Sequence, residues 1–317
     1  MEGGQPSLRL LGPDNPVTAQ GVAWLLTTAL LLSGCTAADE PAADPSPSAS
    51  APTHSTDPTP GPTDSIDPTP SPSPSPSPSA RVKARLVPPR NGACYRLTFA
   101  QATKPANRNR PVTCSKRHNA QTILVGRLDT SVDGRSVAVG SPHVQRQLQR
   151  RCPRELAARI GGTAQSRNLS RFEVVWFTPT VGESDLGATW FRCVAIALAA
   201  TETLAVLPPP ERLRGILGRG TGRSAYGLCG SAAPGDPDFE RVICSRDHRW
   251  RAIATIPLRG GPAYPGEPSV RRAGDTPCTD RARALAGDPL RFDYGWEWPT
   301  RQQWRAGQRF GYCWVPD

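Results

Sequence analysis

The sequence predicts an α+β protein with two tandem small disulfide-bonded domains, each a mostly antiparallel sheet with one or two helices, after a disordered N-terminal stalk. Three observations predict this class. Eight cysteines follow residue 80 in two sets of four, the same order of strand-like and helix-like segments accompanies each set, and the composition changes abruptly near residue 80. We expect a leader at 1–35, a disordered linker at 36–80, domains at 81–200 and 225–317, and a second linker at 201–224.

The leader contains an uncharged apolar segment, 21–32, that ends next to Cys35. A membrane-spanning helix needs ~20 residues, so this segment fits the core of a signal peptide better than an anchor helix. The following Leu32-Ser33-Gly34-Cys35 resembles a bacterial lipobox, in which the cysteine is acylated and becomes the new N-terminus. We therefore expect Cys35 to be lipidated, the alternative being a secreted protein with an incidental cysteine. Arg9 is the only base of this leader, which leaves open a start codon downstream of Met1.

Residues 36–80 hold 13 of the 36 prolines, with Ser, Thr, Ala, Asp and a single Ile. Such a segment buries too little apolar surface to offset the entropy of ordering its backbone. At ~3.1 Å per residue in polyproline conformation, it reaches on the order of 140 Å when fully extended. We expect a spacer that lifts the domains away from the membrane.

Charge changes at the same boundary. Residues 1–80 carry one base and eight acids, whereas residues 81–317 carry 37 Lys plus Arg and 19 Asp plus Glu, a net charge of +18. This field would attract anionic lipid head groups, wall polymers or nucleic acid, although an arginine bias also arises from codon usage in a G+C-rich genome. Export argues against nucleic acid as the partner.

The two halves repeat several landmarks at matching distances. Each has a Gly-x-Cys, then a Val-x-Cys-x-x-x-His, then a cysteine nine residues before a glycine, then Trp and Pro-Thr before a last glycine and cysteine. The spacing from Trp to the last Cys is 17 positions in both halves, and from Gly to Cys it is six. Internal repetition of this kind indicates two copies of one structural unit.

The segments between the landmarks predict strands, then a helix, then strands. Residues 121–128 and 250–256 are rich in β-formers, and 173–177 and 189–198 are expected to be the closing strands of the first copy. A short helix follows the third cysteine of each copy, with Pro153 and Pro277 near its start, where proline is tolerated.

An even number of cysteines in an exported chain indicates disulfides. The third cysteine of each copy is expected on the inner face of the helix and the fourth on the last strand, which favours a helix-to-sheet bond. We predict the pairs Cys94–Cys114, Cys152–Cys193, Cys229–Cys244 and Cys278–Cys313. Four cysteines allow three pairings, and loops of these lengths give ~3 to 4 kcal/mol per bond in the chain-entropy model.

The combined motifs resemble the septum formation-related domain of actinobacterial membrane and exported proteins. The second copy matches the closing pattern best, through Pro299-Thr300, Trp304, Gly307, Arg309 and Cys313, whereas the first copy has Ser184 in place of Trp304. The resemblance implies an extracytoplasmic cell-envelope domain linked to division. It brings no catalytic residues with it.

His118 and His248 are the only histidines at equivalent positions of the two copies. A metal ligand or general base is one interpretation, but zinc requires thiolates, which oxidation removes. A structural histidine in the turn after a disulfide cysteine is the favoured interpretation, and we expect no metal site.

Aromatic residues gather in the second copy and give the candidate binding surface. Flat rings beside arginines are suited to stacking on the sugars of an anionic wall polymer, but tryptophans are more often core residues. The candidates are Trp296, Trp298, Trp304, Trp314 and Arg309.

No nucleophile elbow, His-Glu-x-x-His, phosphate loop or paired-carboxylate motif occurs. We therefore expect a non-catalytic lipoprotein on the outer face of the cell membrane, without a cofactor. It would be held by its lipid, would bind a wall component or an envelope protein, and would not bind nucleic acid. The alternative is an envelope hydrolase with an unrecognised active site.

Overall fold

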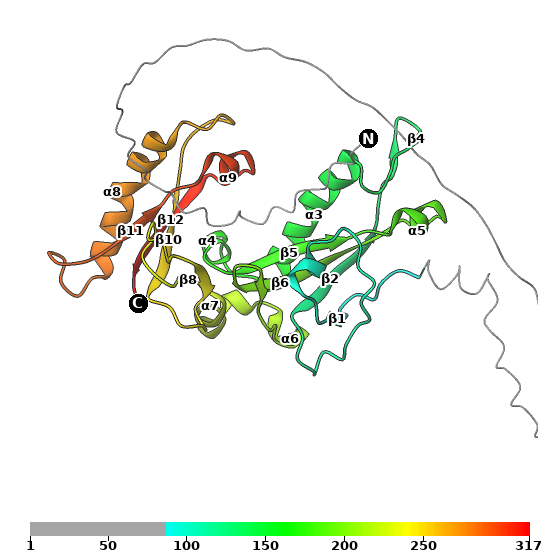
Figure 1. Ribbon diagram of the computed structural model, residues 1–317, viewed down its shortest axis with the longest axis horizontal. Coiled ribbons are helices and arrows are strands. Elements are labelled where there is room, and N and C mark those ends of the chain that lie inside the picture. The colour runs from blue at the N-terminus through cyan, green and yellow to red at the C-terminus, as the bar shows by residue number, and fades with distance from the viewer. Residues whose placement is uncertain (1–86) are drawn as a thin grey trace, which may run out of the picture. The chain divides into compact units, whose positions relative to one another are not determined.

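The computed structural model describes residues 87–317, which form two antiparallel sheets, each accompanied by one long helix (Figure 1). We call residues 91–207 the N-terminal module and residues 227–317 the C-terminal module. The main elements of the N-terminal module are β1 (Cys94–Tyr95), β2 (Ala120–Arg127), α3 (Pro142–Ile160), α4 (Ala164–Asn168), β5 (Phe172–Phe177), α5 (Val181–Asp185) and β6 (Trp190–Ala200). Those of the C-terminal module are β8 (Leu228–Gly230), β9 (Arg241–Ile243), β10 (Trp250–Pro257), α8 (Glu267–Leu285), β11 (Gly295–Glu297), α9 (Arg301–Arg305) and β12 (Phe310–Pro316).

The two sheets have the same strand order. The N-terminal sheet runs β1-β2-β6-β5 and the C-terminal sheet runs β8-β10-β12-β11, with β9 added beside β8. In the N-terminal module the place of β9 is taken by a single bridge between Cys94 and Val112. A short helix with a capping box precedes an inner strand of each sheet, α5 before β6 and α9 before β12. The α+β class, with two disulfide-bonded units on antiparallel sheets, is confirmed.

Each long helix buries a stripe of residues four positions apart. In α3 the stripe is Val144, Leu148, Cys152, Leu156 and Ile160, and in α8 it is Val270, Gly274, Cys278 and Ala282. Residues at i and i+4 share one helix face, so each cysteine points at the sheet. The structure contains all four of the expected disulfides, two of which join these helices to β6 and β12.

The helices begin earlier than the sequence predicts. Pro153 and Pro277 lie inside α3 and α8, and the helices start about ten residues before them. The real start of α3 is an N-cap at Ser141 followed by Pro142. The expected start was wrong because the stripe of small and apolar residues continues on the N-terminal side of each proline, and its burial against the sheet outweighs one lost helical hydrogen bond.

The expected linker at 201–224 is also structured. It contains β7 (Thr203–Leu204), α6 (Pro210–Leu213), the 3₁₀ turn η1 (Ile216–Gly218) and the first part of α7 (Gly220–Tyr226). Leu213, Ile216 and Leu217 lie in the same apolar cluster as the buried stripe of α3. Burial of these apolar side chains is favourable, whereas an exposed linker would leave them in contact with water.

Three further short elements are α2 (Phe99–Ala102) and the hairpin of β3 (Ser131–Val132) and β4 (Arg135–Ser136). Within the described residues, none of the helices combines the length and apolar character needed to cross a membrane. The leader, Cys35 and the stalk lie outside the described residues, so their predicted roles stay predictions.

Candidate functional site: a cleft beside the edge strand β5

A hollow with a volume of about 880 Å³ lies among the described residues. One wall is the last three turns of α3, the floor includes β5, and the opposite wall is α9 with the start of β12. Apolar groups such as Leu156, Val174 and Phe310 alternate with amides such as Gln149 and Gln303 along the lining. A volume and mixture of this kind fall in the range of ligand-binding clefts. A smaller hollow of about 410 Å³ lies between α4 and α7.

Trp176 lines the cleft because its ring is not taken into the core. Trp176 and Trp296 occupy equivalent places, opposite the disulfide cysteines Cys193 and Cys313. In the C-terminal module the ring of Trp296 lies where a Cβ on Gly274 would be, 1.8 Å from its Cζ2 atom, and the ring is buried. None of the residues in the buried stripe of α3 is a glycine, so α3 leaves no equivalent space for the ring of Trp176. The ring of Trp176 is only half-buried, and its Nε1 donates to Gln145 Oε1 at 3.1 Å.

Glu173 is the acidic residue of β5 and contributes to the floor of the cleft. Burial raises the pKa of its carboxyl to about 7, although the positive charges of Arg171 and Arg241 act in the opposite direction. Tyr312 also lines the cleft, and burial raises the pKa of its hydroxyl to about 12. The floor therefore carries a carboxyl group that changes charge near neutral pH beside a hydroxyl that stays protonated.

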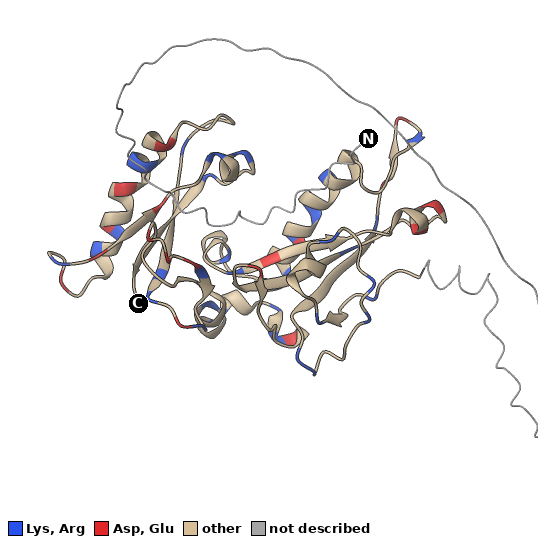
Figure 2. Cartoon of the chain, in the orientation of Figure 1, with Lys and Arg blue, Asp and Glu red and all other residues tan. Residues whose placement is uncertain are grey.

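Arginines surround the cleft. Arg167 donates to the carbonyls of Gly161 and Gly162 at the end of α3, which fixes its position. Arg305 on α9 is exposed and lines the opposite wall. Figure 2 shows that the charged residues of α3 and α9 are mainly basic. Of the charged residues that line the cleft, Arg167 and Arg305 are basic and Glu173 is acidic.

The predicted aromatic surface is mostly interior. Trp296 is 7% exposed and both Trp304 and Trp314 are 0% exposed, so these three rings belong to the core. Trp304 Nε1 donates to Gly261 O at 3.2 Å, and Trp314 Nε1 donates to Glu297 Oε2 at 3.0 Å. A module of this size has few large side chains with which to fill its interior, which is the reason that tryptophan is recruited there.

The other two candidates of that surface are partly accessible. Trp298 is half-buried, with the guanidinium of Arg271 5.3 Å from its ring centre. Arg309 lies over Trp304 at 4.2 Å and donates to its carbonyl oxygen. Arg309 thus fastens the end of α9 to the core and does not reach outward toward a ligand. The sequence-predicted residues are not brought together into a single exposed platform.

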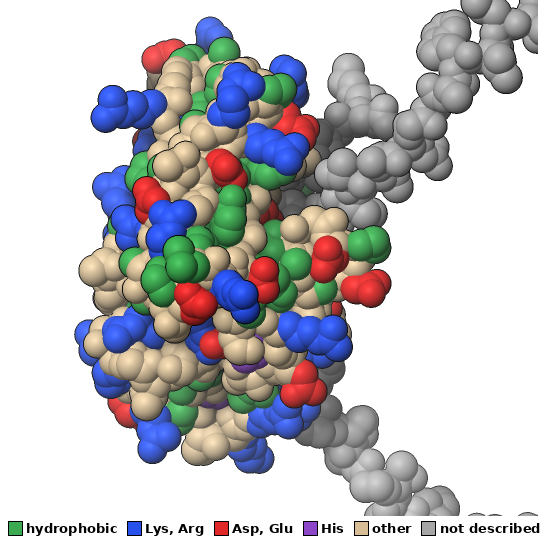
Figure 3. Space-filling view, turned by 90° about the vertical axis from the view of Figure 1, so that its left-hand side faces the viewer, with side chains coloured by type: hydrophobic (Ala, Val, Ile, Leu, Met, Phe, Trp, Pro, Cys, Tyr) green, Lys and Arg blue, Asp and Glu red, His purple; other side chains and the backbone are tan. Residues whose placement is uncertain are grey.

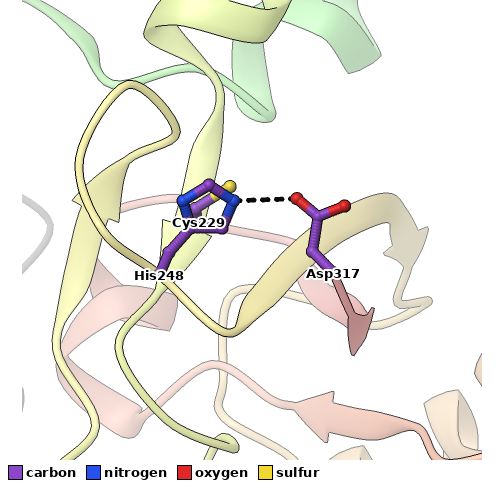
Figure 4. Close-up of side chains that lie close together, drawn as sticks. All are labelled: Cys229, His248 and Asp317. Atoms are coloured by element: carbon purple, nitrogen blue, oxygen red, sulfur yellow. Dashed lines mark hydrogen bonds and ion pairs between the residues drawn. The ribbon is translucent and has the colours of Figure 1, made fainter.

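The two equivalent histidines occupy the same turn. Nδ1 of His118 lies 2.9 Å from Lys116 O, and Nδ1 of His248 lies 2.6 Å from Arg246 O. His118 is buried, whereas His248 also reaches Asp317, with 2.8 Å between Nε2 and Oδ2 (Figure 4).

Cys229, His248 and Asp317 have potential ligand atoms within 4.8 Å of one another. The sulfur of Cys229 is bonded to Cys244 and supplies no thiolate. The carboxylate of Asp317 is also paired with Arg251 at 2.6 Å, and these partners lower its pKa. This geometry supports a structural role for the histidine turn.

The surface charge is widely distributed. On the face shown in Figure 3, basic side chains are spread over the surface, with acidic, hydrophobic and other side chains between them. The positive charge expected from the sequence is therefore general on this face.

Glu173, Trp176 and Arg305 were not among the residues selected from the sequence. One signal was available: Glu173 interrupts the apolar strand Phe-Glu-Val-Val-Trp-Phe. An acid within such a run is either paired or functional. Its position at a cleft depends on contacts between segments far apart in the chain, which no local pattern reports.

The fold and the cleft define a disulfide-bonded α+β protein with a hollow suited to binding. A family model described as Septum formation matches residues 91–313, which is more than half of the 317-residue chain. The chain therefore belongs to the septum-formation family, and this membership links it to septum formation. No curated protein and no solved structure matches it.

Proposed function

We propose that this protein is an exported lipoprotein of the cell envelope that is anchored through Cys35 and takes part in septum formation by binding a wall component or an envelope protein. The observation that carries the binding role is the cleft beside β5, with its mixed apolar and polar lining and the arginines of its flanking helices. Membership of the septum-formation family supports the link to division. The four disulfides support an oxidising compartment, because thiols in the cytosol are kept reduced.

We also propose that the two modules are copies of one domain. The equal strand order, the helix-to-strand disulfides and the capping boxes at Thr180 and Thr300 support this. The copies have diverged at the cleft, since Trp304 is buried in α9 whereas α5 buries no residue. The N-terminal module contributes α3, α4 and β5 to the cleft, and the C-terminal module contributes α9 and the start of β12.

A second candidate function is an envelope hydrolase, which Glu173 favours. A general acid or base works best when its pKa lies near the operating pH, and that of Glu173 is about 7. Hydrolysis of isolated cell wall by the full-length protein, lost in Glu173→Gln and unchanged in Arg281→Glu, would establish this function. No release of soluble fragments from the wall would leave binding as the activity.

The anchor is tested by metabolic labelling with a fatty acid. We expect the label on the wild-type protein and none on Cys35→Ala, which should be released from the membrane because its lipid is missing. Equal labelling of the two proteins would overturn the anchor.

The role of the cleft is tested by the position of a fluorescent fusion in dividing cells. We expect the wild-type fusion and Arg281→Glu, a change on the exposed face of α8, to concentrate at septa. Arg305→Glu should remain in the envelope but spread around the cell, because the reversed charge lies on the wall of the cleft. Septal enrichment of Arg305→Glu equal to that of the wild type would contradict binding through this cleft.

A further inference from the structure

We propose that the cleft binds an extended, acidic segment of another protein, which adds to the N-terminal sheet as a new strand along β5. This inference rests on the proposed binding function and specifies the class of its ligand. It is argued from the position of β5, from the hydrogen bonds of its backbone and from the charge of the flanking elements.

β5 is the last strand of the N-terminal sheet as the structure describes it, because the order β1-β2-β6-β5 leaves one of its sides without a neighbouring strand. Four of its six residues line the cleft. At ~3.3 Å per residue the strand offers an edge of roughly 20 Å. The cleft therefore gives access to a strand edge, which is the template for β-strand addition.

The pairing register shows which backbone groups face away from β6. Leu198 N donates to Arg171 O, and residues of an antiparallel pair exchange hydrogen bonds at every second position. The odd-numbered residues of β5 therefore bond to β6, and the even-numbered residues direct their N–H and C=O groups outward. Thr178, just beyond the strand, agrees with this because its N–H donates to Pro105 O at 3.0 Å.

Val174 and Trp176 are the even-numbered residues in the accessible part of the strand. Among the residues that the structure describes, no backbone hydrogen bond joins the outward groups of either residue to another segment. An added strand would satisfy these groups, and each bond formed would contribute about 1 kcal/mol net.

The charge of the walls selects an acidic ligand. Arg167 and Arg305 line the cleft, and the helices to which they and the remaining wall belong, α3, α4 and α9, together carry eight arginines and one glutamate. Glu173, the acid on the floor, is half-buried. An extended segment with acidic side chains on its exposed face would place them among these arginines.

The acidic segment 36–80 of this chain is a weaker ligand than a segment of another protein. Its prolines, 13 in 45 residues, have no N–H to donate to β5. The chain also enters the described structure ahead of β1, which forms the opposite edge of the sheet. Binding of this segment is an outcome that the experiment distinguishes.

The experiment measures fluorescence anisotropy of labelled eight-residue peptides with the full-length protein in detergent. The panel alternates Glu with Val, Ile, Leu or Phe, and its controls replace Glu by Lys or carry N-methyl groups at alternate residues. We expect micromolar binding of at least one acidic peptide, and no binding of its Lys form. N-methylation on the bonding side should weaken binding about tenfold or more, because it removes the N–H groups that β5 accepts from.

Two pairs of variants locate the binding. Val174→Pro removes one outward N–H of β5 and should weaken binding about tenfold, whereas Val174→Ala keeps that N–H and should retain most of the affinity. Arg305→Glu should weaken binding of the acidic peptides and Arg281→Glu should not. The N-methylated peptide keeps the test decisive if Val174→Pro does not fold.

The proposal is overturned if no acidic peptide binds, if N-methylation has no effect, or if a synthetic peptide of residues 36–80 binds more tightly than every panel peptide. None of these outcomes bears on the lipid anchor or on septal enrichment, which are measured separately in cells. Loss of fatty-acid labelling with intact peptide binding would in turn overturn the anchor alone.

Discussion

Glu173 shows how one residue changes its chemistry through its surroundings. It sits in an apolar strand, and burial moves the pKa of its carboxyl from 4.5 to about 7. A carboxyl that is neutral in the folded protein and ionised in the unfolded chain makes stability depend on pH. Arg171 and Arg241 limit the shift because their positive charges favour the ionised form.

The first prediction concerns this pH dependence. Because the pKa of Glu173 is higher in the folded protein than in the unfolded chain, its protonation stabilises the fold. This contribution to the free energy of unfolding is fully present below pH 4.5 and is lost as pH rises through about 7. The measured quantity is the free energy of unfolding of the wild type minus that of Glu173→Gln. We expect this difference to fall by on the order of 2 kcal/mol between pH 4.5 and pH 8. Urea unfolding of both proteins across this range measures it. A difference that is constant with pH would show that Glu173 titrates normally.

Trp304 is the second residue whose role depends on its position. It is fully buried, hydrogen-bonded to Gly261 and covered by Arg309. We expect Trp304→Ala to lower the free energy of unfolding by about 3 to 5 kcal/mol through the cavity it leaves. Trp298→Ala, at a half-buried ring, should cost less than half as much. Denaturant unfolding compares them, and equal losses would contradict the placement of Trp304 in the core.

At the scale of elements, each long helix is fixed to its sheet by one disulfide and a stripe of residues four apart. The stripe was visible in the sequence and its phase was predicted correctly around Cys152 and Cys278. The length of the helices was not, because Pro153 and Pro277 are ordinarily signals of a helix start. Packing on the sheet sets the length of each helix, so this length follows only from the tertiary structure.

The third prediction uses two glycines in different helices. A Cβ on Gly274 would lie 1.8 Å from Trp296 Cζ2, whereas a Cβ on Gly182 in α5 would meet nothing within 4 Å. We expect Gly274→Ala to destabilise the protein by about 1 to 3 kcal/mol and Gly182→Ala to stabilise it by about 0.5 to 1 kcal/mol. Thermal unfolding of the two variants tests this. Similar shifts of the same sign would contradict the close contact between α8 and β11.

At the scale of the whole described chain, the modules share their cores. Ile243 of β9 belongs to the apolar cluster built on α3, and Ala200 of β6 clusters with Cys229 and Val242. Leu228 N donates to Leu169 O at 2.9 Å, and Thr201 N donates to Glu240 Oε1 at 2.8 Å. The segment between the modules, expected to be a linker, contributes buried leucines to the first core.

The fourth prediction follows from this shared core. We expect a single cooperative unfolding transition for residues 87–317, and we expect Trp304→Ala to lower the midpoint of both modules together. Hydrogen exchange resolved by peptide measures the two modules separately. Unfolding of the C-terminal module in Trp304→Ala with unchanged protection in β2 and β6 would contradict the coupling.

The sequence by itself determined the fold class and the strands near 121–128, 173–177, 189–198 and 250–256, because alternation and helical periodicity are local records of which side chains face inward. It also favoured, among three possible pairings in each set of four cysteines, the disulfides that the structure contains. It also contained the motifs that match the septum-formation family. Only the tertiary structure decided which tryptophans are core and where the cleft lies. Exposure depends on neighbours supplied by distant segments. Gly274 leaves space for the ring of Trp296 in the core, whereas the ring of Trp176 stays half-buried at the edge strand β5.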